Sequence, residues 1–229
     1  MIKIDGIKKT FDNNTVLNNV SFEIDENSFI GLYGKSGSGK STIAKIICGV
    51  LAPDQGQIYI NGTPLYSAKN VYDRKLGIKI QMVYQQPFAA LDPTQRIKAG
   101  FIELIKHNKL AFDKKDTEKI IENIALELGI ENDILQHLPH QISGGEAQRI
   151  AIAKCLLFKP ELLILDEATS MLDASTQANI IELVAKAMKK HGGSVLMISH
   201  DKILLSRLCS KIACIDDNKN IKFVKGSEL

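Results

Sequence analysis

A short run of glycine and serine residues constrains this chain more than any other feature. Gly34–Ser41 reads GKSGSGKS and fits the pattern G-x-x-x-x-G-K-[ST]. It lies between the apolar run Phe29–Tyr33, which is typical of a strand, and Thr42–Val50, where apolar residues recur at helical spacing. Glycines in this context let successive backbone N–H groups converge on phosphate oxygens, and the following helix N-terminus adds partial positive charge. The sequence therefore predicts a phosphate-binding loop between a strand and a helix.

Two side chains of this loop have the chemistry to bind a nucleoside triphosphate with its metal ion. Lys40 is long enough to reach the β- and γ-phosphates, and the Ser41 hydroxyl is short enough to bind Mg²⁺. The residues expected to line the phosphates are Gly34, Lys35, Ser36, Gly37, Ser38, Gly39, Lys40, Ser41 and Thr42.

Two adjacent acidic residues follow a second apolar run. Leu162–Leu165 is strand-sized, and Asp166 and Glu167 come directly after it. Ligands of open α/β sheets bind outside the carboxyl ends of the strands. Asp166 is therefore suited to hold Mg²⁺, and Glu167 to orient or deprotonate an attacking water. Two acids could also simply begin a loop, but the phosphate-binding loop favours the catalytic interpretation.

The order of patterns along the chain predicts an α/β fold with a substantially parallel sheet, interrupted by a helical insertion between about Pro87 and Phe158. The insertion has few strand signals, and Ile121, Ile124, Ala125 and Leu128 in it form one apolar stripe. The predicted strands are Val20–Ile24, Phe29–Tyr33, Gln57–Ile60, Ile80–Tyr84, Glu161–Leu165, Ser194–Ser199 and Ile212–Ile215. The predicted helices are Thr42–Val50, Phe101–His107, Thr117–Leu128, Gly145–Phe158 and Ser175–Lys190, and Ile203–Cys209 continues the alternation of strands and helices.

Composition excludes several classes of protein. The 229 residues carry 29 basic and 26 acidic side chains, a net charge of +3, with 45% apolar residues, which argues against a disordered chain or a strongly basic nucleic-acid binder. No apolar run approaches membrane-spanning length, and Met1–Asp5 has no signal-peptide core, so we expect a cytosolic chain. The four cysteines form no C-x-x-C pair, which favours reduced thiols over disulfides or structural zinc.

Further motifs resemble those of the ATP-binding cassette (ABC) ATPases, in family order over essentially the whole chain. Ile142–Glu146 reads ISGGE and resembles the family signature. Tyr84-Gln85 resembles the start of the glutamine loop, and Ser170–Asp173 the D-loop. His200, after a predicted strand, matches the switch histidine.

The resemblance implies a single ABC ATPase domain over residues 1–229 that binds ATP and Mg²⁺. Its P-loop NTPase core is RecA-like, with a mostly parallel sheet and an antiparallel strand subdomain, over about 1–86 and 159–229; the ABC-specific helical subdomain covers about 87–158. Glu167, His200 and Gln85 would be catalytic, and Ser41, Gln85 and Asp166 would serve the metal. Phe11 lies where the family stacks an aromatic ring on adenine.

The resemblance also implies partners. Ser143, Gly144 and Gly145 would close over ATP held by a second ATP-binding subunit, identical or related, and Asp173 would cross the interface. Binding of ATP would then join two subunits head to tail, and hydrolysis would release them. We expect no nucleic-acid partner.

The run Gln81–Pro87, continuing into Ala90–Pro93, is similar to ATPases of dipeptide, oligopeptide and nickel importers. This branch implies a peripheral subunit on the cytoplasmic face of the membrane, with separate transmembrane permeases and a solute-binding protein. The sequence departs from the family at Ile142, Glu146 and Met171, where Leu, Gln and Ala are more usual. It also ends without the C-terminal extension common in the branch.

Two alternatives have different discriminating features. One is a soluble ABC ATPase of a cytosolic enzyme assembly such as carbon–phosphorus lyase, which only its binding partners would distinguish. The other is a P-loop kinase, which the ISGGE run and the Asp166-Glu167 pair argue against, because they suit water rather than a phosphoryl acceptor.

Overall fold

The computed structural model describes residues 1–12, 14–216 and 219–225, and its contacts divide the chain into two compact units. The first unit comprises Met1–Met82, Pro160–Glu167 and Gly192–Leu229, and the second comprises Val83–Lys159 and Ala168–His191. The second unit thus takes in Ala168–His191 in addition to the predicted helical insertion. This division leaves the expectation of a single ABC domain over residues 1–229 as a prediction.

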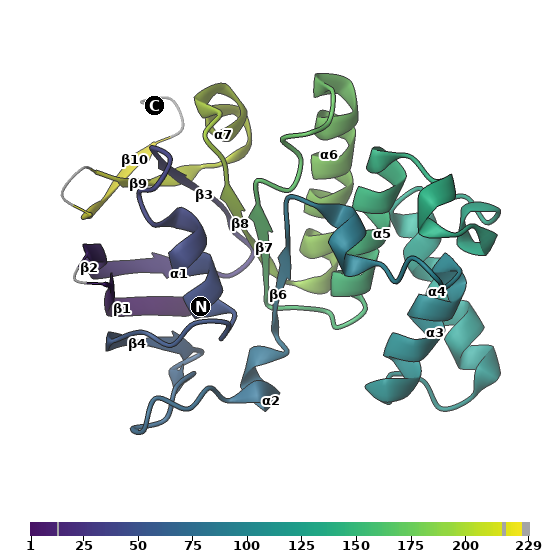
Figure 1. The fold of residues 1–229 in the computed structure, drawn as a ribbon, viewed down its shortest axis with the longest axis horizontal. Helices are drawn as coiled ribbons and strands as arrows, with labels where there is room; N and C mark the ends of the chain where they lie inside the picture. The colour runs from purple at the N-terminus through teal and green to yellow at the C-terminus, as the bar shows by residue number, and fades with distance from the viewer. Residues whose placement is uncertain (13, 217–218, 226–229) are drawn as a thin grey trace. The chain divides into compact units, whose positions relative to one another are not determined.

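The first unit contains a four-stranded antiparallel sheet, in the order β2 (Asn14–Ile24), β1 (Ile2–Phe11), β4 (Gln55–Ile60), β5 (Thr63–Pro64) (Figure 1). Strand β1 alternates buried and partly exposed residues at its start, as a half-buried strand should. The register of β1 with β4 shifts between Asp5 and Lys8.

The same unit contains a six-stranded sheet in the order β10 (Ile221–Lys225), β9 (Lys211–Ile215), β3 (Phe29–Gly34), β8 (Ser194–Ile198), β7 (Leu162–Asp166), β6 (Ile80–Val83). Strands β9, β3, β8 and β7 pair in parallel, and β10 is antiparallel to β9. All five residues of β8 are buried, which is typical of a strand covered on both faces. The prediction of a substantially parallel sheet is therefore confirmed.

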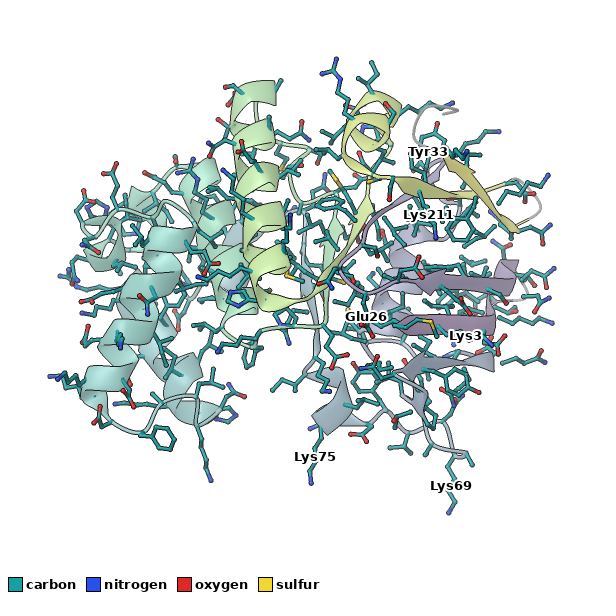
Figure 2. The ribbon with its side chains drawn as sticks, turned by 180° about the vertical axis from the view of Figure 1, so that it is seen from behind. Lys3, Glu26, Tyr33, Lys69, Lys75 and Lys211 are labelled. Atoms are coloured by element: carbon teal, nitrogen blue, oxygen red, sulfur yellow. The ribbon has the colours of Figure 1, made fainter. Side chains whose placement is uncertain are left out.

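The described residues of this unit also form the helices α1 (Lys40–Ile47), α2 (Arg74–Gly77) and α7 (Lys202–Leu208). Charged side chains on its surface point outward, as Lys69 and Lys75 do in Figure 2.

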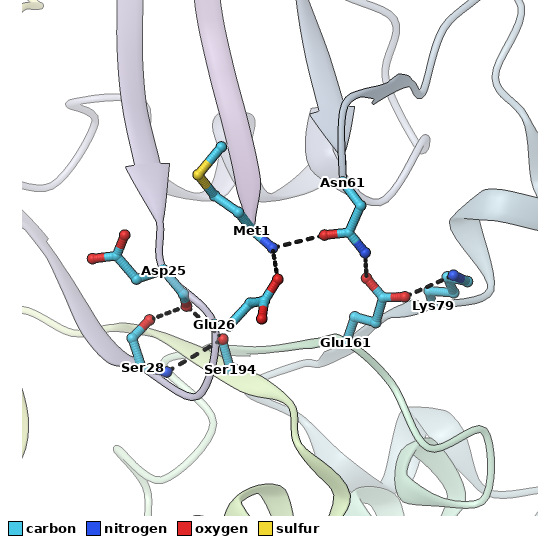
Figure 3. A network of polar contacts seen from close by, with 8 residues as sticks. All are labelled: Met1, Asp25, Glu26, Ser28, Asn61, Lys79, Glu161 and Ser194. Atoms are coloured by element: carbon cyan, nitrogen blue, oxygen red, sulfur yellow. Dashed lines mark hydrogen bonds and ion pairs between the residues drawn. The ribbon is translucent and has the colours of Figure 1, made fainter.

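A polar network links the edges of the first unit (Figure 3). The amino group of Met1 donates to Glu26 Oε1 at 2.9 Å and to Asn61 Oδ1 at 2.7 Å. The Asn61 amide donates to Glu161 Oε2 at 3.0 Å, and Lys79 Nζ lies 2.6 Å from Glu161 Oε1. The network therefore connects the antiparallel sheet with the residues that precede β6 and β7.

The second unit is helical. Its elements are η1 (Pro87–Ala90), α3 (Ile97–His107), α4 (Lys114–Glu127), η2 (Ile134–Gln136), η3 (Pro139–Gln141), α5 (Gly144–Leu156) and α6 (Ala174–His191) (Figure 1). The predicted apolar stripe on α4 is buried. The helical spacing of apolar residues on α6 likewise gives one buried face, made of Ile180, Ile181, Val184, Ala187 and Met188. Across the described parts of the chain, no helix is both long and apolar enough to cross a bilayer.

The strands β1 and β10 were not predicted, and β2 and α3 begin earlier than predicted. Gly6 lies at φ 63° and interrupts the alternation of β1. Helix α3 begins at Ile97, four residues before the predicted start, without a side-chain cap at Arg96. Its first turn contains Gly100, a weak helix former, so no local signal marks the start.

Candidate functional site

The phosphate-binding loop has the backbone that the sequence predicts. Strand β3 ends at Gly34 and α1 begins at Lys40, so five residues of the predicted loop connect the strand to the helix. Gly39 lies at φ 103°, and a Cβ there would come within 2.7 Å of Leu17 Cδ2, so only glycine fits. Gly37 lies at φ 75° and faces open space, since a Cβ there would meet nothing within 4 Å. The loop therefore combines a closely packed base with an open tip.

The polar groups of the loop fit a phosphate ligand. Lys40 is only 7% exposed, and its ammonium donates to the carbonyls of Gly34 at 2.7 Å and Lys35 at 3.0 Å. The Ser38 hydroxyl is buried and has no hydrogen-bond partner among the described residues. A buried cation and an unpaired hydroxyl on one loop favour an anion with several acceptor oxygens. The donor set therefore fits the phosphates of a nucleotide.

A hydroxyl and a carboxylate meet beside the loop. Ser41, in the first turn of α1, donates through Oγ to Asp166 Oδ1 at the end of β7, at 3.2 Å. Burial raises the pKa of the Asp166 carboxyl, the charge of Glu167 raises it further, and the hydrogen bond from Ser41 opposes both. Oxygen ligands of these two kinds are what Mg²⁺ takes in proteins, so the residues fit this metal.

Glu167 and His200 lie side by side at the ends of β7 and β8. Asp166 pairs with Ile198, so the residues that follow the two strands come out at one edge of the sheet. His200 Nδ1 lies 3.4 Å from Glu167 Oε1. Glu167 adopts φ 49°, a left-handed conformation, and its N–H donates to the Ile198 carbonyl at 3.1 Å. Strained backbone of this kind, held by neighbouring structure, is common at functional sites.

Phe11 ends β1 and is 40% exposed. The Lys9 ammonium lies over the Phe11 ring, 5.5 Å from the ring centroid. The first unit therefore contains the phosphate-binding loop, Asp166, Glu167, His200 and Phe11.

The second unit contains the remaining predicted residues: Gln85, Ser143, Gly144, Gly145 and Asp173. The Gln85 amide donates to the Ser170 hydroxyl at 3.2 Å. Ser170 lies 85 positions from Gln85 in the sequence, so no local pattern signals this contact.

Ser143 caps α5 in a reciprocal arrangement with Glu146. The carboxylate oxygen Oε2 of Glu146 accepts from the Ser143 N–H at 2.7 Å and from its hydroxyl at 2.8 Å. In return, the Glu146 N–H donates to Ser143 Oγ at 3.3 Å. The pattern S-x-x-E at Ser143–Glu146 is the local sequence signal for such a capping box.

Asp173 caps α6 in a similar way. Its Oδ1 accepts from the Ser175 hydroxyl at 2.5 Å and from the N–H groups of Ser175 at 3.1 Å and Thr176 at 3.0 Å. These hydrogen bonds, first that from the Ser175 hydroxyl, hold the pKa of Asp173 well below its usual range.

A glycine-rich loop between strand and helix, with a serine and an aspartate meeting at its edge, defines a P-loop NTPase core of the α/β class. A sequence profile described as "ABC transporter" matches residues 17–170. The chain belongs to this family, and the prediction that it is an ABC-type ATP hydrolase is confirmed.

Similar proteins support the predicted branch. Nickel import ATP-binding protein NikE of Escherichia coli K12 is 32% identical over 217 residues, covering 95% of this chain and 81% of the relative. NikE of Shigella dysenteriae is similar to the same extent. The resemblance to the nickel and peptide importer branch is therefore confirmed.

Solved structures have the same fold. The ATP-binding cassette MJ0796, solved as a dimer in a post-hydrolysis state bound to ADP and Pi, is 28% identical, with a TM-score of 0.82 and 98% of each chain covered. CbiO1 of Clostridium perfringens, part of the ABC transporter complex cbiONQ, is 24% identical, with a TM-score of 0.85, covering 99% of this chain and 89% of that one. The second likeness shows the fold alone. The predicted fold class is confirmed.

Proposed function

We propose that this chain is the ATP-hydrolysing subunit that energises an ABC importer for nickel, peptides or a related small solute. The observation that carries the proposal is the pair of contacts Ser41–Asp166 and Glu167–His200 beside the phosphate-binding loop. Similarity to nickel import ATP-binding proteins over 95% of the chain supports the importer assignment.

Different residues of the first unit bind the phosphates, the adenine and the metal ion. Lys40 and the N–H groups of the loop bind the phosphates of ATP, and Phe11 offers an exposed ring to the adenine. Ser41 and Asp166 would hold Mg²⁺, which would offset the cost of the buried Asp166 charge and neutralise charge on the phosphates.

Glu167 is the proposed general base. Its carboxylate orients a water and accepts its proton, while the ATP phosphates provide the electrophilic phosphorus and the leaving group. His200, within 3.4 Å of that carboxylate, contacts the γ-phosphate. Gln85 would be a ligand of the metal. In the nucleotide-free chain its amide instead donates a hydrogen bond to the Ser170 hydroxyl.

The second unit acts on the nucleotide of a second ATP-binding subunit. Ser143, Gly144 and Gly145 lie at or just after the N-terminus of α5, where backbone N–H groups and the helix dipole favour an anion. Asp173 crosses the same interface. The dimeric state of MJ0796 supports a dimer here.

The importer assignment requires partners in the membrane. The chain is proposed to sit on the cytoplasmic face, bound to permease subunits through the segment around Pro87–Phe101, with a solute-binding protein delivering the cargo. Tyr84 and Phe88, 45% and 44% exposed, are apolar side chains suited to this contact.

The test is a pull-down of the tagged chain from its native cells in mild detergent, with co-purifying proteins identified. We expect multi-span membrane proteins with the parent chain and their loss with Phe88→Asp. The matched control is Phe112→Asp, at a fully exposed phenylalanine between α3 and α4, which should retain them. Recovery of soluble enzymes alone would reject the importer and favour a cytosolic ABC ATPase assembly.

A further inference from the structure

Asp216, Lys219 and Asn220 are the described residues of the turn between β9 and β10. Strand β9 runs parallel to β3, and their register pairs Ile215 with Gly34, the first residue of the phosphate-binding loop. Because parallel strands end at the same edge, the chain leaves β9 level with this loop. Ligands of open α/β sheets bind outside that edge. The topology therefore brings residues of this turn to the nucleotide site from far along the sequence.

The described residues of this turn are held by hydrogen bonds. The N–H of Lys219 donates to the Asp216 carbonyl at 3.0 Å, and the Asp216 N–H donates to the Asn220 carbonyl at 3.0 Å. The Asn220 N–H donates to Asp216 Oδ1 at 2.9 Å. Lys219 itself adopts φ 65°, a left-handed conformation that favours glycine. A lysine therefore occupies a position where glycine would carry less strain.

The side chain of Lys219 reaches the tip of the phosphate-binding loop. Its Nζ lies 3.4 Å from the carbonyl oxygen of Gly37, 182 positions away in sequence. Gly37 is the glycine whose missing side chain leaves open space, so a ligand can approach the tip there. The ammonium is thus held near an open anion site by one long hydrogen bond to a neutral acceptor. A phosphate oxygen is a stronger acceptor for it, because charge-assisted hydrogen bonds are stronger than neutral ones.

We propose that Lys219 is a further phosphate-binding residue of the nucleotide site. With nucleotide in the loop, its ammonium leaves the Gly37 carbonyl and contacts a phosphate oxygen, in addition to the contact made by Lys40. A lysine suits this role because its ammonium is a compact charge with rotatable donors on a flexible stem. The inference rests on the proposed function, since it requires a nucleotide in the loop.

Substitution by glycine separates the charge from the fold. Lys219→Gly removes the ammonium and relieves the left-handed backbone, so its melting temperature should equal or exceed that of the parent. Lys219→Arg keeps the charge. Lys222→Ala is the matched control, because Lys222 is an exposed lysine of the same hairpin, on β10.

The measurement is calorimetric titration with ATP, ADP and AMP, in a Glu167→Gln background that holds ATP intact. Lys219→Gly should weaken ATP binding about three- to tenfold at low salt, with a smaller effect on AMP and a smaller difference at high salt. Lys219→Arg and Lys222→Ala should stay within about twofold of the parent.

Two results would overturn the inference. One is ATP binding by Lys219→Gly equal to that of Lys222→Ala. The other is an equal loss for ATP and AMP together with a lower melting temperature, which would indicate a structural role. Lys40→Ala distinguishes this failure from that of the proposed function: if it too binds ATP like the parent, the nucleotide site itself is misplaced.

Discussion

The hydroxyl of Ser41 and the carboxylate of Asp166 are hydrogen-bonded at 3.2 Å, although they lie 125 positions apart in the sequence. This contact joins the first turn of α1 to the carboxyl end of β7. It also places a half-buried carboxylate with a raised pKa beside a hydroxyl, where a divalent cation would stabilise the charged form. The predictions below start from this pair and extend to the residues around it.

Asp166→Asn should raise the melting temperature of the metal-free protein at neutral pH. Because burial raises the pKa of Asp166 above that of the unfolded chain, its ionised form destabilises the fold. The protonated Asp166 carboxyl contributes stability that is fully present below the pKa of the unfolded chain. This contribution is lost as the pH rises through the pKa of the folded protein. The gain from Asp166→Asn should therefore shrink as the pH falls towards the ordinary value of 3.8. The difference in melting temperature between Asp166→Asn and the parent is measured by thermal unfolding from neutral to acidic pH. A difference that grows on acidification would contradict this prediction.

Glu167→Gln should abolish turnover and leave ATP binding intact. The amide keeps the shape of the side chain but cannot accept a proton from water, so the rate should fall by at least about 10²-fold. Phosphate release and ATP affinity are measured on the same preparation. Glu26→Gln, an exposed change in the first unit, serves as the control. Hydrolysis by Glu167→Gln at the parental rate would show that another group is the base.

Glu146→Gln should lower the ATP concentration needed for dimerisation. In the nucleotide-free chain the Glu146 carboxylate accepts a hydrogen bond from the Ser143 hydroxyl. The negative charge of this carboxylate would repel an incoming phosphate. Glutamine can keep the cap and removes the charge. Glu122→Gln on α4 is the control. Light scattering against ATP concentration gives the midpoint, and an unchanged or higher midpoint would speak against competition by this carboxylate.

Glu146→Ala tests the cap by itself. Losing the two hydrogen bonds that the Glu146 carboxylate accepts from Ser143 should cost about 1 kcal/mol of unfolding free energy, while the backbone hydrogen bond from residue 146 to Ser143 Oγ remains. Denaturant unfolding of the alanine and glutamine variants measures it. Equal stability of the two would mean that the capping box contributes little.

Asp173→Ala should destabilise the protein most at neutral pH. Hydrogen bonds from Ser175 and Thr176 hold the pKa of Asp173 low, so the cap stabilises the fold above the unfolded pKa. That stability is lost as the pH falls through the folded pKa. The melting temperatures of parent and variant should therefore converge in strong acid. A difference that is constant with pH would assign the effect to packing alone.

The sequence predicted local features well because their signals are local. The phosphate-binding loop lies within eight residues, and the inner face of α6 follows from helical periodicity. The proximity of His200 to Glu167 was expected in outline, because both follow strands of one parallel sheet, and the pairing of Asp166 with Ile198 shows how it arises.

Long-range pairing was much harder to predict. Strand β1 is stabilised by pairing with β2 and β4, while Gly6 breaks its own alternation. Nothing near Lys219 in the sequence indicates Gly37, since only the register of β9 with β3 brings the turn to the loop. Contacts of this kind depend on the tertiary fold, and no short motif encodes them.

The central claim is that ATP binding joins two copies of this chain into a hydrolytic dimer. Sedimentation velocity of purified Glu167→Gln, with and without Mg²⁺ and ATP, tests it most directly. We expect monomers without nucleotide and dimers with Mg·ATP. The double variant Glu167→Gln with Ser143→Arg should remain monomeric with Mg·ATP. A chain that binds ATP yet sediments as a monomer at every concentration would contradict a homodimeric composite site.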